Sequence, residues 1–296
     1  MVARTDQILT APVAASDAPE SVSAETRAKA RALVEWLHAC GSVAIGFSGG
    51  VDSAFLACVA ASELGPLATL AIIGRSASYP AEQWTTARNV ADRFGVPVLE
   101  VDTEELLDPR YAANPTNRCY FCKSELWSRL APIAEARGFA VLLDGTNADD
   151  LRDYRPGAAA ARAHGVRSPL AEVGLAKAEI RALSRERGLP TWSQPSSPCL
   201  ASRIPYGTAV TPERLARVEA AERALRALGV EGDLRVRHHG DVARVELGAL
   251  EIGRWLGPAS GRLRDAVLSA GYARVAVDLR GFRSGSLNVL SGVTTA

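Results

Sequence analysis

The sequence lacks the marks of a secreted, membrane-spanning or broadly nucleic-acid-binding protein. Its net charge is only +1 over 296 residues, so charge provides no general attraction to nucleic acid. Residues 3–21 contain no apolar core of a signal peptide. The fairly apolar residues 51–73 are interrupted by two acidic side chains and by Gly65-Pro66, which predicts a helix and a strand in place of a membrane span. We therefore expect a cytoplasmic protein with no nucleic-acid or membrane partner.

Cysteine is also scarce. The chain has five cysteines, an odd number that does not suggest a disulfide framework and that fits a reducing cytoplasm. Its length exceeds the usual single domain, and an apolar content of 47% can build a sizeable core. We expect residues 1–22 to be a disordered leader, residues 23–187 to form a first domain and residues 212–296 a second, smaller one. A Pro-rich loop over residues 188–211 joins them and carries Cys199.

The first domain shows strands alternating with helices. Apolar patterning predicts helices over residues 23–39, 53–64, 81–94, 123–137 and 155–164, and strands over residues 43–47, 67–73, 97–101 and 140–143. This alternation is typical of an α/β domain with a parallel sheet covered by helices on both faces. Ligands of such sheets bind at the carboxyl ends of the strands. The turns after the first and fourth strands are therefore expected to converge on one site.

The second domain has a different pattern. The loop before it holds four prolines, and a loop of this length is usually functional or a linker. Helices are then predicted over residues 212–228 and 263–270, and strands over residues 234–238, 243–247 and 274–278. The first two strands are expected to form a hairpin around His239-Gly240-Asp241. This order predicts a smaller α+β domain.

The turn Ser48-Gly49-Gly50-Val51-Asp52-Ser53 stands between a predicted strand and a predicted helix. Free backbone N–H groups and the helix dipole at such a turn favour phosphate, and glycines allow the backbone to come close. Asp52 cannot bind phosphate directly, so its expected role is to hold Mg²⁺. The common motifs GxxxxGK[ST] and GxGxxG are both absent. The alternative is an ordinary capped helix start.

Three cysteines are candidates for metal or cluster ligands. Cys119 and Cys122 form a CxxC pair, and Cys199 on the Pro-rich loop could close a three-thiolate site with one open position. A redox pair remains an alternative, as does zinc with His238 or His239 as a fourth ligand. Cys40 and Cys58 stand at apolar positions and are expected in the core.

Further charged residues follow predicted strands or lie on them. Asp149 and Asp150 follow the turn Gly145-Thr146-Asn147, so one of them could hold Mg²⁺ with Asp52 or simply cap a helix. Arg235 and Arg237 alternate on one strand and therefore share a face. That face suits an anionic ligand, although a solvated charged face is the simpler interpretation.

Taken together, the motifs GFSGGVDS, NRCYFCK, DGTNADD, PCLASRIPYG and the C-terminal VDLRGFRSGSLN resemble those of the LarE family, in the same order. These are PP-loop sulfur transferases that make the nickel-pincer nucleotide of lactate racemase. The resemblance implies an adenine nucleotide alpha hydrolase-like fold, in which residues 23–187 are a PP-loop ATP pyrophosphatase domain. It also implies a homohexamer.

The resemblance assigns roles to residues of this chain. It implies that Cys199 is the sulfur-handling cysteine and that Cys119, Cys122 and Cys199 together hold a [4Fe–4S] cluster. The residues implied to bind ATP and Mg²⁺ are Ser48, Gly49, Gly50, Asp52, Ser53, Gly145, Thr146 and Asp149. The residues implied to contact the substrate are Ser202, Arg203, Arg235, Arg237, Glu222 and Glu246. Glu222, Glu246 and Glu251 lie near the positions of the family's acidic metal-binding group.

The activity implied by the resemblance is attachment of AMP to a carboxylate of pyridinium-3,5-biscarboxylic acid mononucleotide, followed by attack of sulfur. The sulfur comes from sulfide on the cluster or, in other family members, from the cysteine itself, which is consumed. One alternative is a transfer-RNA thiolase, which the near-neutral charge and the lack of an aromatic-rich basic patch disfavour. Another is a non-enzymatic ATP sensor, which would have no need of the three cysteines.

Overall fold

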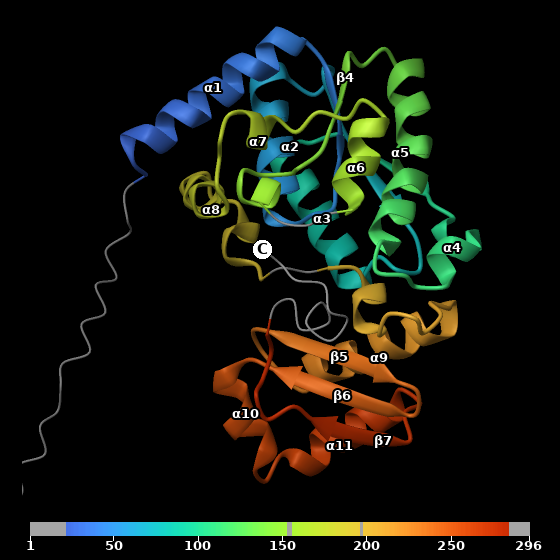
Figure 1. Cartoon of the computed structure of the whole chain (residues 1–296). Helices are drawn as coiled ribbons and strands as arrows, with labels where there is room; N and C mark the ends of the chain where they lie inside the picture. Colours follow the sequence, from blue (N-terminus) through green and yellow to red (C-terminus); the bar gives the residue numbers. More distant parts are fainter. Residues whose placement is uncertain (1–21, 153–155, 196–197, 284–296) are drawn as a thin grey trace, which may run out of the picture.

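The computed structural model describes residues 22–152, 156–195 and 198–283, and these residues contain two β-sheets. Figure 1 shows each sheet with its own helices, in separate parts of the molecule. Almost all of the predicted leader, and residues 284–288 of the last family motif, lie outside the described residues. The predicted domain limits therefore stay predictions, although the two sheets agree with a division into two parts.

The first sheet is parallel throughout. Its strand order is β3-β2-β1-β4, with β1 at Val43–Gly46, β2 at Thr69–Arg75, β3 at Val98–Asp102 and β4 at Val141–Leu143. The chain runs outward from β1 to β3 and then returns to the other side of β1 as β4. Such a reversal is where ligands bind in open parallel sheets. The predicted α/β fold class is confirmed.

Helices cover both faces of this sheet because alternate strand residues point to opposite sides. Val43 and Ile45 of β1 pack in one core with α1 (Ala24–Cys40), α2 (Val51–Leu64), α3 (Ala81–Phe94) and α8 (Lys177–Glu186). Ala44 and Ile72 pack in another core with α5 (Arg118–Ala136) and α6 (Pro156–Ala163). The strands are therefore apolar on both faces, as a buried parallel sheet requires.

The second sheet is mixed. β5 (Leu234–His239) and β6 (Val242–Leu247) form the predicted antiparallel hairpin, and β7 (Arg274–Val277) adds to β6 in parallel. The helices α9 (Pro212–Ala227), α10 (Ala249–Leu256) and α11 (Ser260–Ser269) accompany it, with Trp255 buried in their common core. This is the α+β arrangement expected for the C-terminal part.

The predicted start of one helix is wrong. Helix α5 begins at Arg118 and not at residue 123, so the CxxC pair lies in its first two turns. Residues 118–122 show little helical apolar period, and contacts to a distant loop hold them instead. Helices α8 and α10 were not expected, and the described residues of the Pro-rich loop include two short 3-10 helices. The remaining short elements are η1 (Glu105–Leu107), α4 (Pro109–Ala112), η2 (Asp149–Arg152), α7 (Pro169–Glu172), η3 (Pro190–Ser193) and η4 (Leu200–Arg203).

Candidate active site

The turn between β1 and α2, together with the first residues of α2, forms a backbone cradle, here called the phosphate loop (residues 48–53). Gly49 has φ 69°, and a Cβ there would lie 2.6 Å from the Cβ of Ala87 on α3, so only glycine fits. The Ser48 and Ser53 hydroxyl oxygens lie 3.1 Å apart, and the Ser53 hydroxyl donates to the Gly50 carbonyl at 3.2 Å. The loop ends at the N-terminus of a 14-residue helix. This geometry favours bound phosphate.

The turn after β4 meets the phosphate loop. A Cβ added to Gly145 would lie 2.9 Å from the backbone N of Ser53, so glycine is required for this close approach. Beyond it, the Thr146 N–H donates to the Asp144 carboxylate at 3.0 Å. The two turns therefore converge, as expected from their places after neighbouring parallel strands.

Asp52 and Asp149 are joined by Lys177, the first residue of α8. The Lys177 ammonium lies 2.5 Å from Oδ2 of Asp52, and the Lys177 backbone N–H donates to Asp149 at 2.8 Å. The other Asp52 oxygen, Oδ1, is buried and has no hydrogen-bond partner among the described residues. A buried carboxylate oxygen without a partner suits a hard cation, so these residues fit Mg²⁺ bound beside phosphate.

The three candidate cysteines lie in one neighbourhood. Cys119 and Cys122 stand at the start of α5, and Cys199 is the N-cap residue of η4. Cys122 and Cys199 both pack against the apolar cluster formed by Tyr111, Leu200, Ala201, Ile204, Val210, Leu215 and Val218. Within residues 22–152, 156–195 and 198–283, no three His, Cys, Asp or Glu side chains form a group able to hold a single metal ion.

The loop that carries Cys199 is fastened to residues just before the CxxC pair. Arg118 is buried and donates to the Ala201 carbonyl at 3.1 Å. Asn114, also buried, donates to the carbonyls of Pro205 at 2.8 Å and Thr208 at 2.9 Å, and it accepts a short bond from Arg118. Asn114 has a φ of 57°, a conformation that asparagine tolerates better than most residues. These bonds bring Cys199 to α5.

Protein surroundings act on these sulfurs. Desolvation raises the pKa of the Cys119 thiol, Cys199 raises it further, and the Arg118 guanidinium opposes both effects. Desolvation also raises the pKa of Cys122, to which the nearby carboxylate of Glu105 adds. Without a bound metal, both thiols are therefore protonated at neutral pH. A metal or cluster that takes them as thiolates must release their protons.

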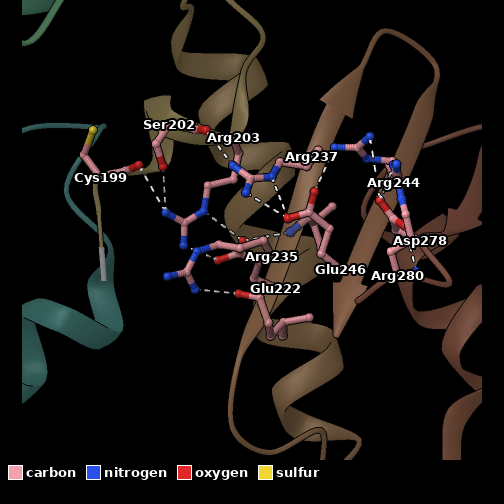
Figure 2. Close-up of polar contacts among 12 residues, drawn as sticks. Cys199, Ser202, Arg203, Glu222, Arg235, Arg237, Arg244, Glu246, Asp278 and Arg280 are labelled. Atoms are coloured by element: carbon pink, nitrogen blue, oxygen red, sulfur yellow. Dashed lines mark hydrogen bonds and ion pairs between the residues drawn. The ribbon is translucent and has the colours of Figure 1, made fainter. Parts of the chain in front are cut away.

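Beyond Cys199, arginines and carboxylates form a continuous network (Figure 2). Arg203, whose side chain is 2% exposed, donates from Nε and Nη2 to the two oxygens of Glu222 at 2.9 and 3.0 Å. Its Nη1 donates to the carbonyls of Pro198 at 2.5 Å and Cys199 at 3.2 Å. Arg203 therefore links the cysteine loop to helix α9.

The network continues along the second sheet. Arg237 donates to the Ser202 carbonyl at 3.0 Å and to the buried Glu246 at 2.9 Å, and Arg244 pairs with the other Glu246 oxygen at 2.8 Å. Burial and the neighbouring Arg203 lower the pKa of Arg235 to about 10, so this guanidinium is still charged at neutral pH. Three buried arginines within one region favour an anionic ligand.

Comparison with known proteins decides the family. A family model described as NAD synthase matches residues 24–131. The pyridinium-3,5-bisthiocarboxylic acid mononucleotide synthase of Lactiplantibacillus plantarum is 37% identical over 260 residues, which cover 88% of this chain and 94% of that relative. The chain belongs to the LarE family.

Two further relatives carry no assigned activity. An uncharacterised protein of Synechocystis sp. is 46% identical over 245 residues, 82% of this chain and 91% of the relative. An uncharacterised protein of Methanocaldococcus jannaschii is 28% identical over 205 residues, 69% of this chain and 77% of the relative. Membership of the LarE family confirms the predicted enzyme class, an ATP-dependent sulfur transferase with a PP-loop.

The structure refines the expectations for the acidic residues. Glu222 and Glu246, which the LarE resemblance places near a metal-binding group, are each paired with arginine here. Glu251 accepts from the Trp255 indole on its own helix at 2.7 Å. Their roles toward substrate stay predictions.

None of the described helices is both long and apolar enough to cross a bilayer.

Several residues of the site could not be predicted from local sequence patterns. Lys177 lies 125 positions from Asp52, and nothing in its local sequence indicates that it reaches the phosphate loop. Asn114 and Arg118 stand beside the CxxC motif, yet their partners are more than 80 residues away. Only the CxxC pair itself offered a signal that this segment meets the Pro-rich loop.

Replacing Arg203 by methionine is expected to destabilise the protein by about 3–5 kcal/mol, because the partly buried Glu222 carboxylate then loses its counter-charge. Urea denaturation measures this effect. Arg264→Met is the matched control, since the Arg264–Asp265 pair is exposed and should contribute at most about 1 kcal/mol. Equal midpoints for the two variants would contradict the importance of the Arg203–Glu222 pair.

Proposed function

We propose that this chain adenylates a carboxylate of pyridinium-3,5-biscarboxylic acid mononucleotide and then replaces the AMP with sulfur to give the thiocarboxylate. One observation supports this beyond the family assignment. The phosphate loop and the Cys199 loop are both hydrogen-bonded to one short segment between β2 and α3, because Tyr79 donates to the Ser48 carbonyl at 3.0 Å and Leu200 N–H to the Ser78 carbonyl at 2.8 Å. Nucleotide chemistry and sulfur chemistry thereby share one site.

In the first step, a substrate carboxylate oxygen attacks the α-phosphorus of ATP. A new P–O bond forms, the bond between the α-phosphorus and the bridging oxygen breaks, and pyrophosphate leaves with the electron pair. The phosphate loop holds the phosphates, and Asp52 would hold Mg²⁺, which offsets the charge that accumulates on pyrophosphate. The Lys177 ammonium lies beside Asp52 and adds a second positive charge near the leaving group.

In the second step, a sulfur nucleophile attacks the activated carboxyl carbon. The C–S bond forms, and the C–O bond to AMP breaks, so AMP leaves as the phosphate monoester. A carboxylate is a poor electrophile, whereas the mixed anhydride with AMP is a good one. We assign binding of the phosphate of the mononucleotide substrate to Arg203, Arg235 and Arg237, because these three guanidinium side chains are buried in one region.

Cys119, Cys122 and Cys199 fit a [4Fe–4S] cluster, because such a cluster binds thiolates and these three thiols lie near one another. These three residues would hold such a cluster, and the cluster would supply exchangeable sulfide as the nucleophile. The other sulfur source, consumption of Cys199 itself, is the alternative. A cytoplasmic location and a homohexamer remain predictions.

The direct test is product analysis. The enzyme incubated with ATP, Mg²⁺ and the biscarboxylic mononucleotide is expected to release AMP and pyrophosphate and to form thiocarboxylate, as measured by chromatography and mass spectrometry. ADP with phosphate would contradict the PP-loop chemistry. AMP without thiocarboxylate, when sulfide is supplied, would contradict sulfur transfer. Incubation with transfer RNA in place of the mononucleotide tests the thiolase alternative, which requires sulfur incorporated into the RNA.

A further inference from the structure

The segment of residues 76–83, here called the connecting segment, follows β2, includes the first turn of α3 and supports the phosphate loop. The Ser48 carbonyl accepts two hydrogen bonds from it, from the Tyr79 hydroxyl at 3.0 Å and from the Gln83 amide at 2.9 Å. Gln83 is 5% exposed, so its bond is protected from water.

These bonds set the direction of a peptide group. The C=O of one residue and the N–H of the next point in opposite directions across a planar trans peptide. Since the Ser48 carbonyl is held toward the connecting segment, the Gly49 N–H is turned the other way. The connecting segment therefore orients the backbone of the loop that is expected to bind ATP.

The same segment supports the loop that carries the third thiol. The Ser78 carbonyl accepts from the N–H of Leu200, the residue after Cys199, at 2.8 Å. The Gln194 amide adds a longer bond of 3.4 Å to Gln83. A shift of the connecting segment would therefore move Cys199 relative to the phosphate loop.

Glu105 holds the connecting segment in place. This carboxylate is 2% exposed and accepts from the hydroxyls of Ser76 at 2.5 Å, Ser78 at 2.7 Å and Thr103 at 2.8 Å. Its donors are thus three neutral hydroxyls, and no ion pair with lysine or arginine is found for it among the described residues. Burying a carboxylate without a counter-charge is unfavourable, and these three hydrogen bonds are its compensation. They fix both serines at the edge of the connecting segment.

We propose that Glu105 is a positioning residue that fixes the position of the loop carrying Cys199 relative to the phosphate loop, so that sulfur reaches the adenylated carboxyl before water does. The inference rests on the proposed function and adds to it a residue that governs coupling between its two steps. A displacement of about 1 Å between reacting groups can lower a rate by about 10²-fold. Water needs no such alignment, so a displaced Cys199 loop should yield AMP without thiocarboxylate.

The test compares Glu105→Gln and Glu105→Ala with Glu104→Gln. Glu104 is the matched control, because it is the neighbouring glutamate, is exposed and pairs with Arg129. Adenylation is measured as substrate-dependent exchange of labelled pyrophosphate into ATP, and sulfur transfer as thiocarboxylate formed per AMP. We expect exchange within about 3-fold of wild type in both Glu105 variants, because the Gln83 amide on α3 still holds the Ser48 carbonyl, and a ratio of thiocarboxylate to AMP lowered about 10-fold. Glu104→Gln should change neither.

An unchanged ratio in folded Glu105→Gln would overturn the inference, and so would an equal loss of both activities, which a merely structural role would produce. Glu105→Gln keeps the side-chain shape, so this variant provides the test in case the alanine variant does not fold. Hydrogen exchange of a peptide covering residues 198–206 gives a readout that needs no activity. The Leu200 amide should exchange faster in Glu105→Ala than in Glu104→Gln, and equal rates would also overturn it. Wild-type enzyme that makes no thiocarboxylate would refute the proposed function and leave this exchange test intact.

Discussion

Asp52→Ala is expected to lower the formation of AMP and pyrophosphate by about 10²-fold or more. The Asp52 carboxylate stands in the first turn of α2, with Oδ2 paired to Lys177 and Oδ1 buried with no hydrogen-bond partner in the described part of the chain. Removing it takes away the oxygen that would hold Mg²⁺ on the departing phosphates, and it leaves the Lys177 ammonium without its partner. Initial rates at saturating ATP, with AMP separated by chromatography, measure the loss.

A matched control is Asp265→Ala, which removes an exposed aspartate that pairs with Arg264. It should leave the rate unchanged. Asp52→Asn keeps the shape but lacks the charge, so it should behave like the alanine variant if the cation is what matters. Full activity of either Asp52 variant at low Mg²⁺ would contradict the assignment.

The second large effect concerns the thiols. Anaerobically reconstituted protein is expected to bind about four irons per chain, and Cys119→Ala or Cys122→Ala should lose them together with catalytic turnover. Cys40→Ala is the control, because Cys40 packs with the core of the first sheet, whereas Cys122 packs with a different apolar cluster. Iron and sulfide analysis, with the visible absorption spectrum, measures cluster content. Stoichiometric zinc with no iron after reconstitution would contradict the cluster.

Mass spectrometry then separates the two sulfur sources. If the cluster supplies sulfide, each chain should make more than one thiocarboxylate when sulfide is added, and Cys199 should keep its full mass. Departure of H₂S from a cysteine lowers its mass by about 34 Da. Such a loss at Cys199, in step with product, would show that the cysteine is consumed, and Cys119 with Cys122 would then require another role.

Much of this protein is determined by short-range patterns in its sequence. The alternation of apolar strands and amphipathic helices is enough to predict the parallel α/β sheet, because both elements have a fixed side-chain period. The phosphate loop is also local, since Ser48, Gly49, Gly50 and Ser53 lie within six positions of one strand–turn–helix junction. The CxxC pair is local in the same way, although the start of its helix was placed five residues too late.

Tertiary structure alone decided which distant residues meet. Lys177 reaches Asp52 across 125 positions, and Leu200 reaches Ser78 across a similar stretch, because helices and loops from separate parts of the chain converge at the carboxyl edge of one sheet. The burial of Glu105 could not be predicted either, because a glutamate in a polar stretch gives no sign that three hydroxyls will donate to its buried carboxylate. Sequence periodicity reports which face of an element is apolar, whereas partners of buried charges depend on packing between elements.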